Sequence, residues 1–249
     1  MKILYQKIIN ITRATMLLGV LIIISNCSSK RKTNDLSYFN LKGQIESIKE
    51  YSYEAVDHFG IIDKGKLTAT YSGGKHSYKI FNKNGYAIED NWLNNDGSLY
   101  MKLVYKYDKL GNRIESIFYD PEDFIISKDL NQFDNEGNLL VTSSYGNDGK
   151  LNSRTTRIYN SENNLIQVSI YVSTGELSHK IVYEYDEKGN RKESRGYDSK
   201  GNLTSRKIFE YDLNKNNTKS WVYKEDGNIN YWYKYQYDKD GNLVEETFF

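Results

Sequence analysis

From Phe81 to its last residue, the sequence repeats itself every 26 residues. Each repeat begins with an aromatic residue, and a second series of mostly aromatic residues lies between these starts. The spacing between successive members alternates between 12 and 14 residues without a slip. The first series is Phe81, Tyr107, Phe133, Tyr159, Tyr185, Tyr211 and Tyr237, and the second is Leu93, Tyr119, Tyr145, Tyr171, Tyr197 and Tyr223. A fixed period of roughly 20–50 residues is typical of a repeat architecture.

Each half of the repeat carries the residues of a tight turn: an aromatic residue, Asp or Asn, two further residues, and usually Gly. Asp or Asn favours the first turn position by accepting hydrogen bonds from backbone N–H groups, and Gly adopts the positive φ that closes the turn. The glycines predicted to close turns are Gly85, Gly97, Gly111, Gly137, Gly149, Gly175, Gly189, Gly201, Gly227 and Gly241. Between the turns remain strands of about six and eight residues. The sequence therefore predicts an all-β fold, in which tandem β-hairpin repeats form one long twisted antiparallel meander sheet that can curl into a superhelix.

Side chains at fixed repeat positions predict how neighbouring strands align. If each turn is centred between its two middle residues, the ninth position of a repeat faces the twenty-second position on the neighbouring strand. In three of the repeats, this pairing places a Glu opposite a basic residue. These pairs are Glu89–Lys102, Glu115–Lys128 and Glu193–Arg206. The nineteenth position is always aliphatic and is interpreted as an inward anchor after each turn. It is occupied by Leu99, Ile125, Leu151, Leu177, Leu203 and Ile229.

The N-terminus has the pattern of an export signal. Lys2, Lys7 and Arg13 precede an apolar run over residues 14–24, which is the length of a secretory signal and short for a bilayer span. The run leads to Ile-Ser-Asn-Cys27, which resembles a bacterial lipobox and implies that the Cys27 thiol is acylated. Residues 1–26 are thus interpreted as a lipoprotein signal peptide; the alternative is a plain signal peptide with an incidental Cys. Because Cys27 is the only cysteine, an intramolecular disulfide is excluded.

The rest of the chain divides by composition. Residues 27–40 are polar and are interpreted as a flexible tether, residues 41–80 as an N-terminal strand and capping region, and residues 81–249 as the repeat array. Without the signal the chain holds 31 basic and 33 acidic residues, so no nucleic-acid partner is expected. The expected partner is the membrane, through the lipid anchor. The basic residues soon after Cys27 favour the periplasmic face of the outer membrane over the cell surface.

The tandem Tyr-Asp-x-x-Gly-Asn motif resembles the YD or Rhs repeats, which are β-strand repeats of bacterial toxin shells and cell-surface proteins. The order of lipobox, opening segment and repeats is similar to that of small lipoproteins of the Bacteroidetes type. The opening segment here runs from Leu41 to Tyr51 as Leu-Lys-Gly-Gln-Ile-Glu-Ser-Ile-Lys-Glu-Tyr. The resemblance covers residues 41–249 and implies an architecture. It does not extend to toxin encapsulation, since a closed shell needs far more repeats.

Catalytic and metal sites are not indicated by any motif. The turn at Asp238 superficially resembles a calcium loop, but its Gly is fourth and Phe249 is twelfth, where an EF-hand needs Gly sixth and Glu twelfth. The Glu residues recur at repeat spacing opposite Lys or Arg, whereas a catalytic pair would occur once. The sequence therefore predicts a chain that is not an enzyme and that has no cofactor or metal.

Aromatic residues near the C-terminus are the main candidates for a binding site. Tyr105, Tyr183, Phe209 and Tyr235 share one strand position and are interpreted chiefly as cover for a thin core. A denser group departs from the repeat and is predicted to bind ligand: Trp221, Tyr231, Trp232, Tyr233 and Tyr235. The favoured function is a non-enzymatic cell-envelope module that binds or scaffolds protein or glycan. The alternatives are an immunity or accessory factor of a toxin system and, third, an envelope polysaccharide hydrolase. The final strand, ending in Phe248 and Phe249, is also expected to allow self-association through its edge.

Overall fold

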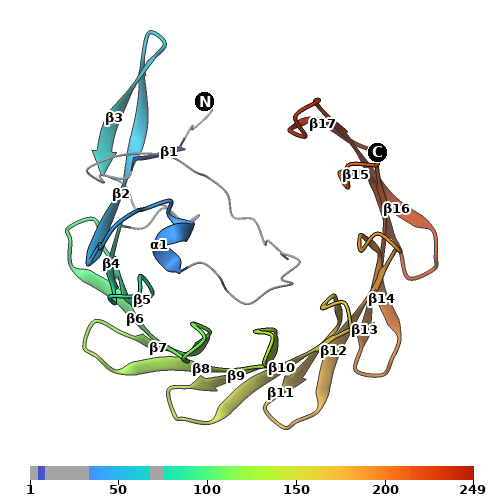
Figure 1. Ribbon diagram of the computed structural model, residues 1–249, viewed down its shortest axis with the longest axis horizontal. Helices are drawn as coiled ribbons and strands as arrows, with labels where there is room; N and C mark the ends of the chain where they lie inside the picture. The colour runs from blue at the N-terminus through green and yellow to red at the C-terminus, as the bar shows by residue number, and fades with distance from the viewer. Residues whose placement is uncertain (1–4, 9–33, 68–75) are drawn as a thin grey trace. The chain divides into compact units, whose positions relative to one another are not determined.

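A computed structural model describes residues 5–8, 34–67 and 76–249, and these residues form strands, tight turns and one short helix (Figure 1). Cys27 and the apolar run before it lie outside the described residues. Over the described ranges, no helix has the length and apolar character needed to cross a membrane. The chain divides into two compact units.

Unit 1 holds the described residues up to Gly137 together with Ser144–Lys150. Its elements are β1 (Tyr5–Ile8), α1 (Asp35–Tyr38), β2 (Ser47–His58), β3 (Ile61–Leu67), β4 (His76–Phe81), β5 (Ala87–Leu93), β6 (Leu99–Tyr107), β7 (Arg113–Tyr119) and β8 (Ile125–Phe133). Strands β4 to β8 pair antiparallel in chain order. Strand β2 pairs antiparallel with β1, β3 and β4 along different parts of its length.

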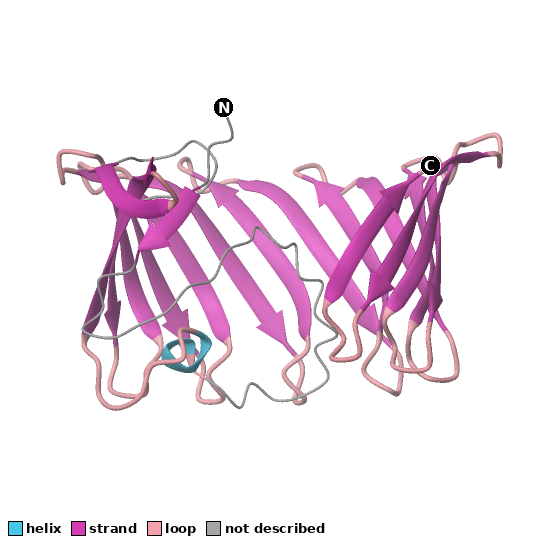
Figure 2. Cartoon of the chain, turned by 90° about the horizontal axis from the view of Figure 1, so that it is seen from above, coloured by secondary structure: helices cyan, strands magenta, loops and turns pink. Residues whose placement is uncertain are grey.

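Unit 2 holds Asn138–Ser143 and Leu151–Phe249, and strand β9 (Leu139–Gly146) is divided between the units. Its further strands are β10 (Leu151–Tyr159), β11 (Leu165–Val172), β12 (Leu177–Tyr185), β13 (Arg191–Asp198), β14 (Leu203–Tyr211), β15 (Asn217–Tyr223), β16 (Ile229–Tyr237) and β17 (Leu243–Phe248). Each pairs antiparallel with the next from β10 to β17. Figure 2 shows the strands joined by short loops. The predicted all-β meander of hairpins is confirmed.

The turns are closed by the predicted residues. In the turn after β6, Asp108 Oδ1 accepts hydrogen bonds from the N–H groups of Leu110 and Asn112, and Asp108 Oδ2 accepts one from the Asn112 side chain. The Gly111 N–H donates to the Asp108 carbonyl at 3.2 Å. The same Asp–Asn pairing holds the turns that begin at Asp186, Asp198, Asp212 and Asp238. In these four turns, the hydrogen bond from Asn to the carboxylate lowers the pKa of the Asp. All ten predicted glycines have positive φ.

The predicted strand register is wrong by two residues. Glu89 faces Val104 and Glu193 faces Ile208, not the basic residues at the twenty-second position. Two features of each turn account for this shift. The Asn94 N–H donates to the Ser98 carbonyl, which makes the turn wider than a two-residue loop. Next to the turn, a bulge shifts the register between Trp92 and Leu93.

Two of the three predicted charge pairs still form, as diagonal contacts between residues on neighbouring strands that are not directly opposite each other. Arg206 Nε lies 2.7 Å from Glu193 Oε1, and Lys128 Nζ lies 4.0 Å from Glu115 Oε1. In the third, Lys102 pairs instead with Asp123. The direct partner of the basic residue is an aromatic ring of the second series. Lys102 lies 4.9 Å from the centre of the Tyr119 ring, Lys180 lies 5.2 Å from that of Tyr197, and Arg206 lies 4.9 Å from that of Tyr223. A repeated cation–π contact therefore accounts for the basic residue at this position.

The first aromatic series has a hydrogen-bonding role that the repeat pattern did not predict. Its tyrosine hydroxyl donates to the backbone carbonyl 20 residues earlier, on the neighbouring strand. These bonds are Tyr107 to Ala87 (2.7 Å), Tyr159 to Leu139 (3.2 Å), Tyr185 to Leu165 (2.8 Å), Tyr211 to Arg191 (3.0 Å) and Tyr237 to Asn217 (2.9 Å). Phe133 has no hydroxyl, and the Asn131 side chain donates to the corresponding carbonyl of Arg113 instead, at 2.9 Å.

The core is thin. Among the described residues, the buried hydrophobic side chains are Leu36, Phe81, Ala87, Leu103 and Tyr183. The predicted inward anchors at the nineteenth position are not buried, and Ile125 and Ile229 are 44% and 50% exposed. That prediction was wrong because these residues are the first of their strands, where the sheet margin leaves them few neighbours.

Part of the predicted tether is an ordered helix. Asn34 caps α1 by accepting a hydrogen bond from the Ser37 N–H at 3.0 Å. Leu36 packs against Phe81 and Ala87 of the first repeat, and Phe39, Leu41, Ile45, Ile48 and Tyr105 surround this cluster. Residues 34–40 are therefore part of the fold, because Leu36 and Phe39 cover apolar side chains that the sheet alone leaves open to water.

Candidate functional site

The tryptophans predicted to bind ligand lie together on one face of unit 2. Trp221 on β15 faces Trp232 on β16, with ring centroids 6.5 Å apart and an interplanar angle of 21°. The Trp232 ring stacks on Phe249 at 4.0 Å and 6°. Trp221, Trp232 and Phe249 thus form a row of nearly parallel rings, here called the tryptophan face.

The predicted tyrosines lie on the opposite face, because successive side chains of a strand point to opposite sides. Tyr231 and Tyr233 contact each other edge-on at 5.7 Å, and Tyr233 stacks with Tyr235 at 6.0 Å. Phe248 of β17 contacts both Tyr231 and Tyr233, at 5.5 and 5.3 Å. Tyr231, Tyr233, Tyr235 and Phe248 are here called the tyrosine face. The five predicted site residues therefore belong to two surfaces, not one.

Both faces are open to water and offer polar groups. Phe248 and Phe249 are 62% and 53% exposed, while the tryptophans and tyrosines are half-buried by one another. The Tyr235 hydroxyl lies 3.3 Å from Ser220 Oγ. Within the described part of the chain, the hydroxyls of Tyr231 and Tyr233 have no hydrogen-bond partner. Burial by neighbouring rings raises the pKa of Tyr233. These faces can pack against apolar parts of a ligand and hydrogen-bond to its polar groups at the same time.

The residues of this cluster depart from the repeat at defined positions. Trp232 occupies the repeat position held elsewhere by Lys102, Lys180 and Arg206. Phe249 occupies the position of the tyrosines that these basic residues contact, which are Tyr119, Tyr197 and Tyr223. Tyr231 occupies a position that is Ser127, Ser153 and Ser205 in other repeats. A ring stack here replaces the cation–π pair found elsewhere in the array, so the fold did not require the tryptophan.

A second candidate site lies in unit 1 and was missed by the sequence analysis. It is a pocket of about 420 Å³ between α1 and strands β4 to β7. Its lining residues are Asn34, Asp35, Tyr38, Phe39, Lys79, Ala87, Asp90, Tyr105 and Arg113. Pockets that hold small molecules commonly have volumes of roughly 300–1,000 Å³.

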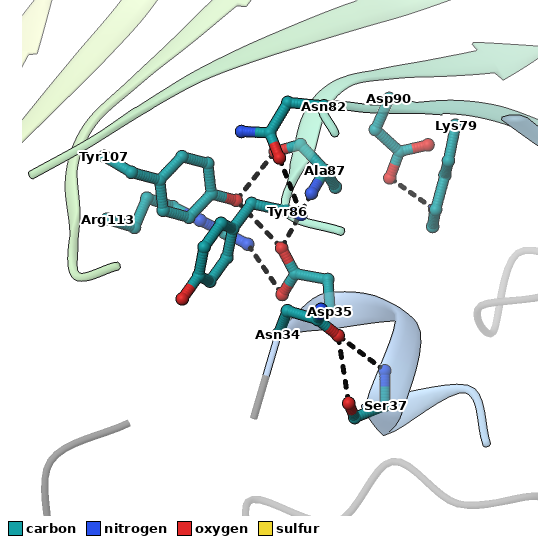
Figure 3. Close-up of polar contacts among 10 residues, drawn as sticks. All are labelled: Asn34, Asp35, Ser37, Lys79, Asn82, Tyr86, Ala87, Asp90, Tyr107 and Arg113. Carbon is teal, nitrogen blue, oxygen red and sulfur yellow. Dashed lines mark hydrogen bonds and ion pairs between the residues drawn. The ribbon is translucent and has the colours of Figure 1, made fainter. Parts of the chain in front are cut away.

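Asp35 fastens α1 to the wall of this pocket (Figure 3). Its carboxylate accepts hydrogen bonds from the Ala87 N–H at 2.8 Å and from the Tyr107 hydroxyl at 3.0 Å. Arg113 Nη2 lies 3.9 Å from its other oxygen. Burial raises the pKa of Tyr107 to about 12, so its hydroxyl stays protonated and donates at neutral pH.

Two buried polar atoms of the pocket residues have no partner in the part of the chain that the structure describes. Asp90 is 7% exposed, and its Oδ2 lies 2.5 Å from Lys79 Nζ (Figure 3). Among the described residues, Asp90 Oδ1 and Arg113 Nε are both buried without a hydrogen-bond partner. The Arg113 guanidinium also lies 4.0 Å from the centre of the Tyr105 ring. An unsatisfied buried polar group costs about 1–3 kcal/mol, so such groups call for an explanation.

The pocket could be found from the sequence only in part. Asn34 followed by Asp35 and Ser37 is a helix-start signal, and it could have predicted α1. Nothing local in the sequence indicates that the helix packs against a turn some fifty residues later, where Asn34 and Gly85 meet.

Across the ranges that the structure describes, no group of three His, Cys, Asp or Glu side chains could hold a metal ion.

The comparisons with known proteins concern the fold. No protein-family model matches the chain, and no curated protein matches it. Among solved structures, it is similar to one described as TcdB2-TccC3 without the hypervariable C-terminal region, with a TM-score of 0.49 and 16% identity. That likeness covers 84% of this chain and 11% of the other, so the chain spans about a ninth of that protein. It is also similar to a porin-like protein from Bacteroides uniformis, with a TM-score of 0.39 and 11% identity over 72% of this chain and 91% of that one.

Proposed function

We propose that this chain is a non-enzymatic binding or scaffolding module, held at the periplasmic face of the outer membrane by a lipid on Cys27. In this proposal, the tryptophan and tyrosine faces of β15–β17 hold a protein or a glycan. The observation that carries it is the gathering of seven aromatic rings on β15, β16, β17 and the residue after β17, with Phe248 and Phe249 more than half exposed.

Aromatic rings suit this role because they offer large contact areas at little cost in conformational entropy. Contiguous exposed apolar surface is uncommon on water-facing proteins and often marks an interaction site. Three further side chains enlarge the surface at the same strands: Ile229, Leu243 and Val244 are 50%, 51% and 62% exposed.

The carboxylates of unit 2 favour a binding role over hydrolysis. Glu193 accepts contacts from both Arg195 and Arg206, at 3.1 and 2.7 Å. Glu184 pairs with Arg195 and with Lys192. Acidic side chains neutralised in this way maintain strand alignment and are poor proton donors. The self-association expected through the edge of β17 stays a prediction.

The test uses variants that restore the repeat sequence, since these preserve the fold. Trp232→Lys places a lysine over Phe249, as Lys180 lies over Tyr197, and Tyr231→Ser matches Ser153 and Ser205. The full chain is screened against a glycan array and in pull-downs from envelope fractions, and each partner found is titrated against the purified chain. We expect the two variants together to weaken binding at least tenfold, which corresponds to about 1.4 kcal/mol.

The matched control is Tyr145→Ser, which removes an aromatic ring that lies beneath Lys128 and belongs to unit 1, not to the cluster. It should bind like the unaltered chain. Equal affinity of the unaltered chain and the double variant for every partner would contradict the proposal.

A further inference from the structure

The pocket of unit 1 is assembled from five elements: α1 and, about forty residues later in the sequence, the consecutive strands β4 to β7. Asp35, Tyr38 and Phe39 come from α1 and its C-cap, Lys79 from β4, Asp90 from β5, Tyr105 from β6 and Arg113 from β7. The Asp35 contacts with β5, β6 and β7 hold the helix above the sheet. The pocket is therefore a built feature of the fold, not a gap between neighbouring turns.

The charged groups of the pocket balance. Asp35 lies beside Arg113, and Asp90 is bonded to Lys79, so two carboxylates face two cations. An anionic ligand would meet Asp35 and Asp90, and a cationic one would meet Lys79 and Arg113. A neutral ligand avoids the repulsion between like charges that either charged ligand would meet, because each charge of the pocket is already compensated within the chain.

The unused hydrogen-bonding groups require both donors and acceptors from a ligand. Asp90 Oδ1 is nine-tenths buried and can only accept, whereas Arg113 Nε can only donate. Within the described residues, the Tyr105 hydroxyl has no partner and can do either. Hydroxyl groups suit this mixture, since each of them both donates and accepts.

The remaining walls are aromatic. Phe39, Tyr105 and Tyr38 line the pocket, and the Arg113 guanidinium covers one part of the Tyr105 ring. Such rings pack against the C–H groups of a ligand, while the polar atoms at the margin set its orientation. A compact neutral molecule with several hydroxyls and an apolar ring face meets all these conditions.

We propose that this pocket binds a neutral saccharide unit, whose hydroxyls bond to the Tyr105 hydroxyl and to the polar groups of Asp90 and Arg113 that line the pocket. The site is separate from the two aromatic faces of unit 2 and does not depend on the function proposed for them.

The experiment titrates the full chain with individual sugars, followed by calorimetry and by saturation-transfer NMR. The neutral probes are glucose, galactose, mannose and N-acetylglucosamine, and the charged probes are glucuronate and glucosamine. We expect at least one neutral sugar to bind, and each charged probe to bind more weakly than its neutral counterpart.

The decisive variant is Tyr105→Phe, which removes only a hydroxyl and keeps the ring under Arg113. It should weaken sugar binding about five- to tenfold, which is the effect of one hydrogen bond. The matched control is Tyr183→Phe, because Tyr183 holds the same repeat position in unit 2 and lies 4.4 Å from Arg191 in the same manner. Asp90→Ala should abolish binding; if it does not fold, Tyr105→Phe still decides the matter.

Three results would overturn the inference: no binding of any neutral probe, tighter binding of glucuronate or glucosamine than of glucose, or equal affinity in Tyr105→Phe and Tyr183→Phe. Trp232→Lys is titrated as well, to separate this site from the aromatic faces. Loss of sugar binding in Trp232→Lys but not in Tyr105→Phe would place the sugar on the aromatic faces and reject the pocket.

Discussion

Glycines that close equivalent turns in this chain have the same backbone role but different neighbouring side chains. Gly111 and Gly189 close turns of nearly the same sequence, with φ of 82° and 78°. A Cβ on Gly189 would meet nothing within 4 Å, whereas one on Gly111 would overlap the Tyr86 hydroxyl. The spacing of Asp and Gly predicted both turns, but the approach of Tyr86 follows from the packing of a different hairpin.

We predict that Gly189→Ala lowers the free energy of unfolding by about 1–2 kcal/mol, the cost of a left-handed backbone for a residue with a Cβ. Gly111→Ala should cost more, because Tyr86 must also move away from the Tyr107 ring, whose centroid lies 5.0 Å from its own. Urea denaturation of both variants measures the difference. Equal losses would mean that the Tyr86 contact has no energetic weight.

At the scale of strands, a tyrosine that starts a repeat, such as Tyr211, ties three consecutive strands together. Its strand is paired with both neighbours, and its hydroxyl adds a bond to the carbonyl 20 residues earlier. The sequence showed that an aromatic residue recurs at this position, but not that its hydroxyl donates a hydrogen bond to the neighbouring strand. The donor became apparent only when the bulge and the wider turn had set the register.

We predict that Tyr211→Phe destabilises the chain by about 0.5–1.5 kcal/mol, because the Arg191 carbonyl loses the hydroxyl that donates to it. Tyr197→Phe is the control: over the described residues its hydroxyl has no hydrogen bond, and its ring keeps the contact with Lys180. Thermal and urea unfolding should leave this control near the unaltered chain. A similar loss in both variants would show that the bond to Arg191 contributes nothing.

For the whole molecule, the two units have different sources of stability. In repeat arrays, each repeat is stabilised mainly by its immediate neighbours. Unit 1 adds a small apolar cluster of Leu36, Phe81 and Ala87, closed by α1. Unit 2 has Tyr183 as a buried aromatic and otherwise depends on contacts between adjacent strands.

We predict that Leu36→Ala costs about 2–5 kcal/mol, since the side chain is 6% exposed. Hydrogen exchange should accelerate in β4–β6, while β12–β16 keep their protection. Leu110→Ala, at a side chain that is 54% exposed, should change neither. Faster exchange in β12–β16 of the Leu36 variant would contradict the idea that each repeat depends on its neighbours.

The sequence by itself determined the period, the turns and the antiparallel meander. These features depend only on the residues within each turn, such as Gly111 and Gly189, and on the regular spacing of the turns along the chain. Only the tertiary structure decided the register and the pocket beneath α1. Those features depend on bulges and on contacts between distant residues, such as Asp35 with Ala87, 52 positions away, and with Tyr107, 72 positions away. A local pattern carries no information about such contacts, since they form only when the strands between them have aligned.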